Sequence, residues 1–337
     1  MIRWLVPLLI LFFCEVVLSE PKYPLSDHYD GDKFHNPGKT DQLKSFWDVL
    51  KWQLTSDKVP FPEHVPNKNY PFRPLTSTNK VNVTFINHAT FLIQLPGLNV
   101  LTDPVYSQRV SPFTFFGPKR VREPGLPFED LPPIDVVIVS HSHYDHLDTE
   151  TLKQLDKKYH PLILLPLGNE SMMRRLNIQN FKTMDWWESE SIKDVKITFA
   201  PAQHWSNRHL WDKNETLWGS FMVDNGQQKI YFAGDTGLGP HFKEIRKRHG
   251  SPDLALLPIG AYKPRWFMQF HHMNPEDSVR AHQELEAKRS IGMHFGTWQL
   301  TDEGINEPVE DLKVALEKAG LKEDDFLVLD QGQSLSY

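Results

Sequence analysis

The feature that most constrains this 337-residue chain is a cluster of metal-ligand side chains directly after a short apolar segment. Residues 134–140 have the β-branched composition of a buried strand. Three histidines and an aspartate follow within six positions, at His141, His143, Asp145 and His146. Neutral imidazoles and carboxylates are ligands for zinc, iron or manganese, and burying four such groups without a partner is costly. Their alternating offsets let the first two reach one ion and the last two reach a second.

Four neighbouring residues cannot complete two coordination spheres, so further ligands must come from distant parts of the chain. Three later segments repeat the same order of an apolar strand, a small residue and a ligand-type side chain. These segments lead to His204, Asp235 and His294. Small residues at such positions let the backbone come close to an occupied site. We therefore expect these three loops to meet the first cluster.

With this ligand pattern, the sequence resembles the metallo-β-lactamase superfamily, whose His-x-His-x-Asp-His motif corresponds to residues 141–146. Over about residues 83 to 332 it resembles one branch more closely, the N-acyl-phosphatidylethanolamine-hydrolysing phospholipase D family. The ligands alone indicate only the superfamily, and the blocks between them, many rich in tryptophan, indicate the branch. These blocks are residues 87–90, 101–104, 117–120, 131–135, 185–188, 203–205, 217–220, 258–262, 264–268 and 294–297.

The resemblance implies a centre of two zinc ions, although iron or manganese would suit the same ligands. It implies one ion held by His141, His143 and His204, a second held by Asp145, His146 and His294, and Asp235 as the bridge. A hydroxide shared by the two ions would attack phosphorus, and both aspartates would take part in catalysis. The implied reaction is phospholipase D type hydrolysis of N-acyl phosphatidylethanolamine to N-acylethanolamine and phosphatidic acid. A lactone or another phosphodiester is the alternative substrate.

Other residues are expected to surround this centre. His272 matches a family histidine near the phosphate, where it would bind substrate and act as general acid. Its neighbour His271 is a further substrate contact, although the family pattern has Gln there. Arg208 is a candidate contact for the phosphate, and Phe267 for the lipid. Asp103 is expected to accept the second N–H of a ligand histidine, and the alternative is an ordinary turn aspartate before proline.

The first nineteen residues have the pattern of a secretory signal. A charged start is followed by an apolar run over 4–13 and by small residues, so we expect cleavage after Ser19. Because the run is short for a membrane span, an uncleaved anchor is the less favoured alternative. The chain's one cysteine, Cys14, lies in this segment, and the exported chain would therefore contain no disulfide. We expect an exported protein, either periplasmic or secreted.

Residues 20–80 are expected to form an N-terminal arm, and residues 81–337 one catalytic domain, because the ligands must converge. Residues 41–54 of the arm predict a short amphipathic helix that starts near Thr40 or Asp41. Its apolar residues fall on one face, namely Leu43, Phe46, Trp47, Leu50 and Leu54. Packing of this face against the domain is favoured over an interfacial helix that reaches lipid.

The order of strands and helices after residue 80 predicts the fold. Strands are expected near 81–86, 91–95, 98–102, 134–140, 162–165, 195–200, 220–224, 228–233, 253–257, 290–293 and 326–329. Helices are expected from about 149 and near 169–177, 240–248, 275–287 and 307–319. Strands interleaved with outer helices favour an α/β fold, the four-layer αββα sandwich that the resemblance also implies.

The remaining patterns concern partners. A net charge of −6 and dispersed basic residues argue against nucleic acid as a partner. Two aromatic segments, 113–116 and 266–270, are candidates for contact with a phospholipid substrate at a membrane surface. They would equally suit the core or a subunit interface, and the resemblance implies a homodimer. We therefore expect peripheral membrane association and a homodimer.

Overall fold

The computed structural model describes residues 21–39, 44–72, 75 and 80–337. The expected signal segment, residues 1–19, and the expected start of the arm helix at Thr40 or Asp41 lie outside these residues. Among the residues described, no helix is both long and apolar enough to cross a membrane.

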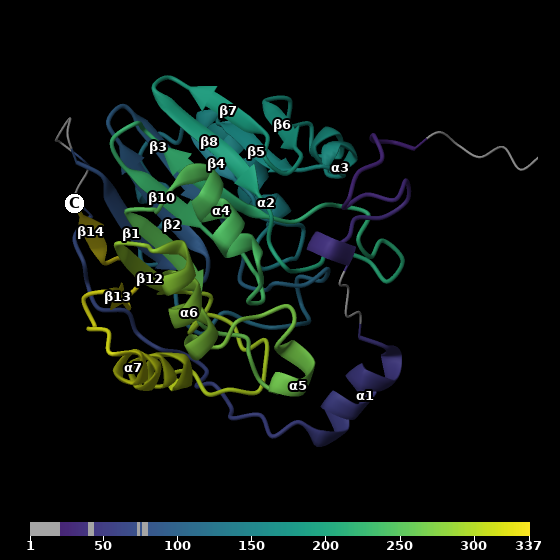
Figure 1. Ribbon diagram of the computed structural model, residues 1–337, viewed down its shortest axis with the longest axis vertical. Helices are drawn as coiled ribbons and strands as arrows, with labels where there is room; N and C mark the ends of the chain where they lie inside the picture. Colours follow the sequence, from purple (N-terminus) through teal and green to yellow (C-terminus); the bar gives the residue numbers. More distant parts are fainter. Residues whose placement is uncertain (1–20, 40–43, 73–74, 76–79) are drawn as a thin grey trace, which may run out of the picture.

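Two seven-stranded sheets form the centre of the molecule (Figure 1). The first contains, in spatial order, β14 (Ser334–Ser336), β1 (Asn82–Asn87), β2 (Thr90–Leu95), β3 (Leu98–Thr102), β4 (Val136–Ile138), β5 (Leu162–Pro166) and β6 (Phe181–Met184). The second contains β13 (Phe326–Leu327), β12 (Arg289–Met293), β11 (Leu254–Pro258), β10 (Lys229–Phe232), β9 (Ser220–Asp224), β8 (Val195–Ala200) and β7 (Ser189–Ile192). Both sheets mix parallel and antiparallel pairs.

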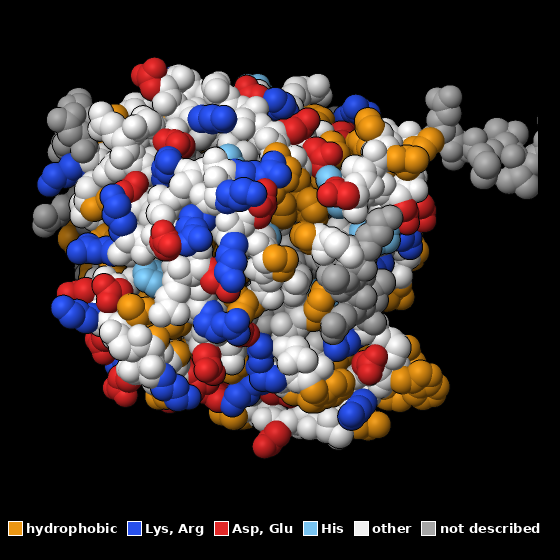
Figure 2. Space-filling model, in the orientation of Figure 1, with side chains coloured by type: hydrophobic (Ala, Val, Ile, Leu, Met, Phe, Trp, Pro, Cys, Tyr) orange, Lys and Arg blue, Asp and Glu red, His pale blue; other side chains and the backbone are white. Residues whose placement is uncertain are grey.

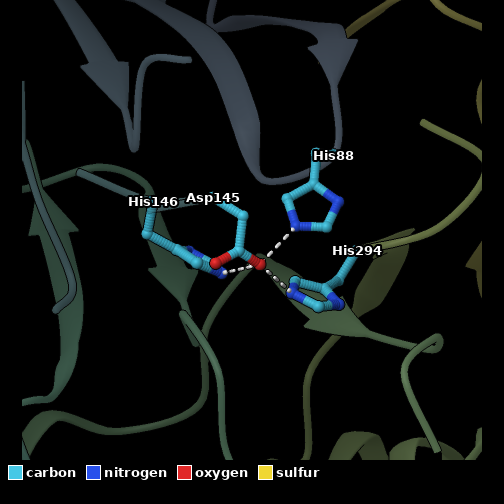
Figure 3. A group of neighbouring side chains, drawn as sticks. All are labelled: His88, Asp145, His146 and His294. Carbon is cyan, nitrogen blue, oxygen red and sulfur yellow. Dashed lines mark hydrogen bonds and ion pairs between the residues drawn. The ribbon is translucent and has the colours of Figure 1, made fainter. Parts of the chain in front are cut away.

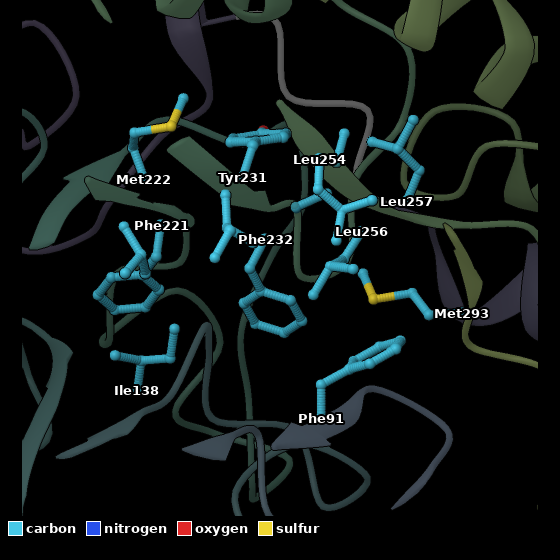
Figure 4. Close-up of a cluster of buried hydrophobic side chains, with 14 of the residues drawn as sticks. Phe91, Ile138, Phe221, Met222, Tyr231, Phe232, Leu254, Leu256, Leu257 and Met293 are labelled. Atoms are coloured by element: carbon cyan, nitrogen blue, oxygen red, sulfur yellow. The ribbon is translucent and has the colours of Figure 1, made fainter. Parts of the chain in front are cut away.

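The main core lies between the two sheets. Phe91 and Ile138 of the first sheet lie opposite Phe221 and Phe232 of the second, and all four are fully buried (Figure 4). These residues belong to one continuous apolar cluster, as expected when two sheets pack face to face. Strand residues of the opposite parity, such as Val137, contribute to a second cluster on the outer face of the first sheet.

Helices cover the outer faces of both sheets. The second cluster includes side chains of α2 (Thr149–Tyr159) and α3 (Glu170–Arg175), which therefore cover the first sheet. On the second sheet lie α4 (His241–His249), α6 (Pro275–Leu285) and α7 (Glu307–Ala319), and α6 contacts both of the others and β11. The four layers confirm the fold class that the sequence predicts. Two short 3-10 helices, Pro37–Lys39 and Phe128–Asp130, and the one-turn α5 (Arg265–Met268) complete the elements described.

Most predicted elements end within two residues of the observed ones, and Asp148 caps α2 as expected. The strands β6, β7 and β14 and the helix α5 were not predicted. β6 and β7 are short and only partly buried, and β14 is an exposed pairing at a sheet edge, so none has a clear alternating pattern.

The arm helix differs from the prediction in its start and in its packing. Among the described residues α1 spans Phe46–Thr55, because Ser45 forms a capping box with Asp48. The expectation that its apolar face packs against the domain is wrong, because the side chains of Phe46, Trp47 and Leu54 are 73%, 73% and 77% exposed. Leu50 is half-buried, and Leu43 lies outside the described residues. An amphipathic pattern defines an apolar face without defining what covers it.

Candidate metal centre

The predicted ligands lie at the ends of strands from both sheets. The loop after β4 in the first sheet carries residues 141–146, whereas His204, Asp235 and His294 follow β8, β10 and β12 in the second. Gly234 precedes Asp235 with φ +58, and a Cβ atom there would lie 2.5 Å from Cβ of Ser140. This contact confirms that a small residue is needed where the loops of the two sheets approach each other.

The first group of ligand atoms comes from three histidines. Nδ1 of His143 lies 2.8 Å from Nε2 of His141 and 3.2 Å from Nε2 of His204. His204 donates its Nδ1–H to the backbone carbonyl of His271 at 2.9 Å, which leaves the Nε2 lone pair facing the group. Three imidazole nitrogens that lie this close to one another are suited to hold a cation.

The second group surrounds Asp145 (Figure 3). Oδ2 of Asp145 lies 3.5 Å from Nε2 of His146 and 3.3 Å from Nε2 of His294. A fourth residue, His88, places Nε2 at 3.1 Å from the same oxygen. All four donor atoms lie within 4.8 Å of one another. The grouping is the one predicted for the second ion, with His88 in addition.

Asp235 lies between the two groups. Its carboxylate is 3.3 Å from Nε2 of His146 and 3.1 Å from Nε2 of His294 in the second group. The same carboxylate is 3.8 Å from Nε2 of His204 in the first group. With only 3% of its surface exposed, Asp235 is placed to bridge two cations.

Asp103 supports the second group from behind, as the sequence predicts. Its carboxylate accepts a hydrogen bond from Nδ1 of His146 at 2.6 Å, which fixes that ring with Nε2 toward the centre. Ser140 donates to Asp103 twice, from its backbone N at 2.7 Å and from Oγ at 2.6 Å. The fully buried aspartate therefore joins the strand end of β4 to a ligand.

The charges of the two groups differ. Burial lowers the pKa of His143 to about 4 and the pKa values of His141 and His204 well below the ordinary range, so the first group is neutral. Burial also opposes charge on His146 and His294. The nearby Asp235 and Asp145 carboxylates nevertheless raise the pKa of His146 well above its ordinary value and that of His294 to about 9.

The buried donor atoms fit a pair of cations. Nε2 atoms of His146 and His294 and Oδ1 of Asp235 are buried without a well-formed hydrogen bond among the described residues. They lie near one another and face the same interior space, an arrangement that would be costly without a positive ion. The buried His and Asp clusters are thus consistent with a binuclear metal site, and nitrogen and carboxylate oxygen suit zinc, iron or manganese.

These pKa values predict that metal binding releases protons. His294 carries a proton below about pH 9 in the metal-free protein, and a cation requires its Nε2 to be unprotonated. The metal affinity should therefore rise with pH up to about 9, by about tenfold per pH unit for each proton released. Calorimetric titration of metal-free protein at pH 7.5, in two buffers that differ in ionisation enthalpy, measures the release. Equal heats in the two buffers would contradict it.

A cavity of about 350 Å³ opens beside the metal ligands. His272 and His271 line it next to Asp235, and Phe267 and Met268 of α5 form an apolar wall. The arm completes this wall, because Val49 and Trp52 of α1 also line the cavity. Two contacts hold Trp52 in place. Its Nε1–H donates to the carboxylate of Asp302 at 3.0 Å, and its ring packs against that of Phe267 with centroids 5.0 Å apart.

Three of the four predicted substrate contacts, His271, His272 and Phe267, therefore lie in the cavity. The fourth, Arg208, does not. Its Nη1 donates at 2.8 Å to the backbone carbonyls of Ser142 and Leu147, and its guanidinium lies 3.9 Å from the ring centre of Tyr144. Arg208 thus supports the metal-binding loop. The prediction that it contacts the phosphate is therefore wrong. It faces a separate open groove of about 1360 Å³.

Sequence reasoning missed His88. It lies in the tight turn between β1 and β2, far in sequence from the ligand motif, and it follows no glycine or other small residue. The signal that would have found it is a polar Asn-His pair between two fully buried strands.

Comparison with known families matches residues 98–295 to the Beta-lactamase superfamily domain. Among solved structures, the metallo hydrolase Igni18 from Ignicoccus hospitalis superimposes with a TM-score of 0.58 at 20% identity. That match covers 77% of this chain and 99% of Igni18. The match to the Beta-lactamase superfamily domain, together with the ligand geometry above, makes this chain a metal-dependent hydrolase of the metallo-β-lactamase superfamily.

Two relatives narrow this class. The N-acyl-phosphatidylethanolamine-hydrolyzing phospholipase D 1 of Caenorhabditis elegans is 38% identical, over 89% of this chain and 89% of its own length. The mitochondrial protein of the same description from Saccharomyces cerevisiae is 38% identical, over 67% of this chain and 50% of its own length. The chain belongs to the N-acyl-phosphatidylethanolamine-hydrolysing phospholipase D family, which confirms the resemblance seen in the sequence.

Proposed function

We propose that this protein is a zinc-dependent phospholipase D that hydrolyses N-acyl phosphatidylethanolamine to phosphatidic acid and N-acylethanolamine. One observation supports it most directly. The cavity beside the ligands joins a strongly polar floor of histidines and aspartates to apolar walls from α1 and α5. A phosphodiester that carries acyl chains has the same two-part chemistry, and its reacting phosphate would meet the floor.

The ligands described above would hold two cations, which supply a water of lowered pKa and neutralise charge on the phosphoryl oxygens. In the reaction an oxygen from water joins phosphorus, and the bond from phosphorus to the ethanolamide oxygen breaks. The leaving oxygen needs a proton. His272 lines the cavity with Nδ1 at 3.8 Å from Asp235, and burial lowers its pKa to about 4. This neutral ring would accept the proton of the attacking water and donate it to the leaving oxygen.

The apolar walls would hold the lipid. Phe267, Met268, Trp52 and Val49 lie on one side of the cavity, and Leu300 also lines it. Because Trp52 of α1 packs against Phe267 of α5 with ring centroids 5.0 Å apart, the arm and the domain together form one apolar wall, and an acyl chain would lie along it. His271 lies at the base of this space, where the family pattern has Gln.

An assay with two lipids tests the proposal. Zinc-loaded full-length protein is incubated in mixed micelles with either N-acyl phosphatidylethanolamine or ordinary phosphatidylethanolamine, and mass spectrometry detects the products. We expect N-acylethanolamine and phosphatidic acid from the first lipid and much slower hydrolysis of the second. Hydrolysis of a lactone or a simple phosphodiester, with no amide released from the lipid, would contradict the proposal and favour the alternative substrate class.

Association with a membrane surface is part of this proposal. The exposed side chains of Phe46, Trp47 and Leu54 lie on the outside of α1, whose inner side lines the cavity. Figure 2 shows hydrophobic side chains gathered over α1 with basic side chains among them. Lys51 of α1 lies 4.6 Å from the ring centre of Trp266. Apolar side chains flanked by lysines suit the boundary between acyl chains and phosphates.

Replacing Trp47 by Ala should therefore weaken membrane binding without destabilising the fold. Inserting one large aromatic side chain contributes about 1.5–3 kcal/mol, so partition into liposomes should fall by at least about tenfold. Flotation with phosphatidylcholine–phosphatidylglycerol liposomes that contain no substrate measures this. Gln53→Ala, an exposed polar position on the same helix, is the matched control and should bind as the unchanged protein does.

Two outcomes would contradict the role of α1 at the membrane. One is unchanged liposome binding of Trp47→Ala with a lower melting temperature, which would mean that the face is packed. The other is conversion of a dimer to a monomer, which would make the face a subunit contact.

The expected homodimer and the expected export are also proposals. Light scattering of the purified protein should give twice the mass of one chain, and a single-chain mass would contradict the dimer. For the exported protein, N-terminal sequencing should begin at Glu20.

A further inference from the structure

We propose that His88 is a positioning residue of the metal centre, which holds Asp145 and His294 together across the two sheets. The proposal rests on the metal centre that the proposed function requires, and it concerns only how that centre is held. Three sets of contacts carry it, namely those of the turn that bears His88, of its side chain and of its backbone.

The turn between β1 and β2 is rigidly placed. His88 is 2% exposed and adopts φ +45, a backbone conformation that His tolerates better than most residues. Asn87 donates from Nδ2 to the carbonyl of Val105 at 3.3 Å, and Thr90 donates from Oγ1 to the carbonyl of Asp103 at 2.7 Å. The turn is thus tied to the segment that carries Asp103, which itself supports His146.

The side chain of His88 contacts ligands on two sides (Figure 3). Its Nε2 lies 3.1 Å from Oδ2 of Asp145, at hydrogen-bond distance. Its ring lies over that of His294, with ring centroids 3.9 Å apart. It also packs against Trp298 in a T-shaped arrangement, with ring centroids 5.1 Å apart. A donated N–H would fix the orientation of the Asp145 carboxylate, and the ring contact would fix that of His294.

The backbone of His88 binds the same loop as its ring. The His294 N–H donates to the carbonyl of His88 at 2.7 Å, and the His88 N–H donates to Oγ1 of Thr297 at 3.2 Å. Asp145 follows a strand of the first sheet, and His294 follows a strand of the second. The second group takes Asp145 from the first sheet and His294 from the second. His88 is therefore a single residue that contacts both and joins them.

A purely packing role would not need these contacts. A phenyl ring could fill the space between His294 and Trp298, but it could not donate to Asp145. Loss of a partner that orients a ligand typically weakens metal affinity by about 10–100-fold. The effect should be confined to the cation held by Asp145, His146 and His294. Among the described residues, the side-chain hydrogen bond and ring contacts of His88 reach this group and Trp298, and none reaches the first group.

Two substitutions separate positioning from packing. His88→Phe keeps the ring and removes the donor, whereas His88→Gln keeps an N–H donor of similar reach. His282→Phe is the matched control, because His282 is also buried and hydrogen-bonded, to Ser290 at 2.9 Å, but lies on α6. Zinc affinity of the metal-free proteins is measured by competition with a chromophoric chelator, together with the cobalt absorption spectrum and the melting temperature.

We expect His88→Phe to bind the second zinc 10–100-fold more weakly while the first zinc binds as in the unchanged protein, and His88→Gln to recover most of the loss. His282→Phe should keep both affinities. Wild-type affinities in His88→Phe would overturn the proposal. Equal losses in both His88 variants with equal falls in melting temperature would show a role in the turn alone. A cobalt spectrum of His88→Gln that has lost a nitrogen ligand would make His88 a ligand instead. No lipid is present, so failure here leaves the proposed substrate untouched.

Discussion

Replacing Asp235 by Asn should remove bound metal and activity together. The substitution keeps the shape of the side chain and removes its negative charge. That charge lies within 3.8 Å of imidazole nitrogens from both ligand groups, at His146, His294 and His204. Without it, two cations side by side would lose the one anion between them, and repulsion between them would rise.

The expected loss is large. Removing a group that only orients a ligand costs about 10–100-fold in metal affinity or activity, so removing a bridging ligand should cost more than about a hundredfold in each. Elemental analysis and the lipid assay measure the two quantities on the same preparation. Asp324→Asn, an exposed position in the loop after α7, is the control and should retain both. Activity that survives complete loss of metal would contradict the scheme.

Removing the carboxylate of Asp103 should damage both the fold and the metal centre. Asp103 is fully buried and accepts hydrogen bonds from Ser140 N, Ser140 Oγ and His146 Nδ1, at 2.6 to 2.7 Å. Asp103→Ala would leave these donors without a partner in the core. Breaking such a buried charged pair costs about 3–5 kcal/mol, so the free energy of unfolding of the metal-free protein should fall by this amount.

A second variant separates the two effects. In Asp103→Asn the amide oxygen can still accept from Ser140, but the amide NH₂ would face Nδ1 of His146. That contact favours the tautomer with the proton on Nε2, the nitrogen that must bind the cation. We expect a smaller loss of stability than in Asp103→Ala, and a loss of about 10–100-fold in metal affinity in both. Denaturant unfolding and chelator competition measure the two. Wild-type metal affinity in Asp103→Asn would contradict the role.

Local patterns were sufficient for much of the site. The ligands His141 to His146, His204, Asp235 and His294 each follow a strand whose composition is visible in the chain, and all of them converge. Parallel pairing of β10, β11 and β12 explains why Asp235 and His294 lie close together, because it brings the ends of these strands to one edge of the second sheet. Asp103 was predictable for the same reason, since it follows β3, which pairs in parallel with β4.

Features that depend on contacts between distant segments were not predictable. His88 lies in the turn between β1 and β2, and its place beside Asp145 depends on how β1 to β4 pair within the first sheet, which the local sequence of the turn does not define. Arg208 has the charge expected of a phosphate contact, yet two backbone carbonyls of the metal loop bind its guanidinium. The apolar face of α1 was recognised, but its exposure depends on which surfaces of the domain reach it.

In the proposed metal centre, seven side chains from the two sheets hold two cations next to each other. The most direct test is the metal content of protein purified without chelators, measured by elemental analysis and followed by titration of the stripped protein with zinc. We predict two transition-metal ions per chain, and saturation of the stripped protein at two equivalents. Protein that contains no transition metal when fresh, and binds none when zinc is added, would contradict this account.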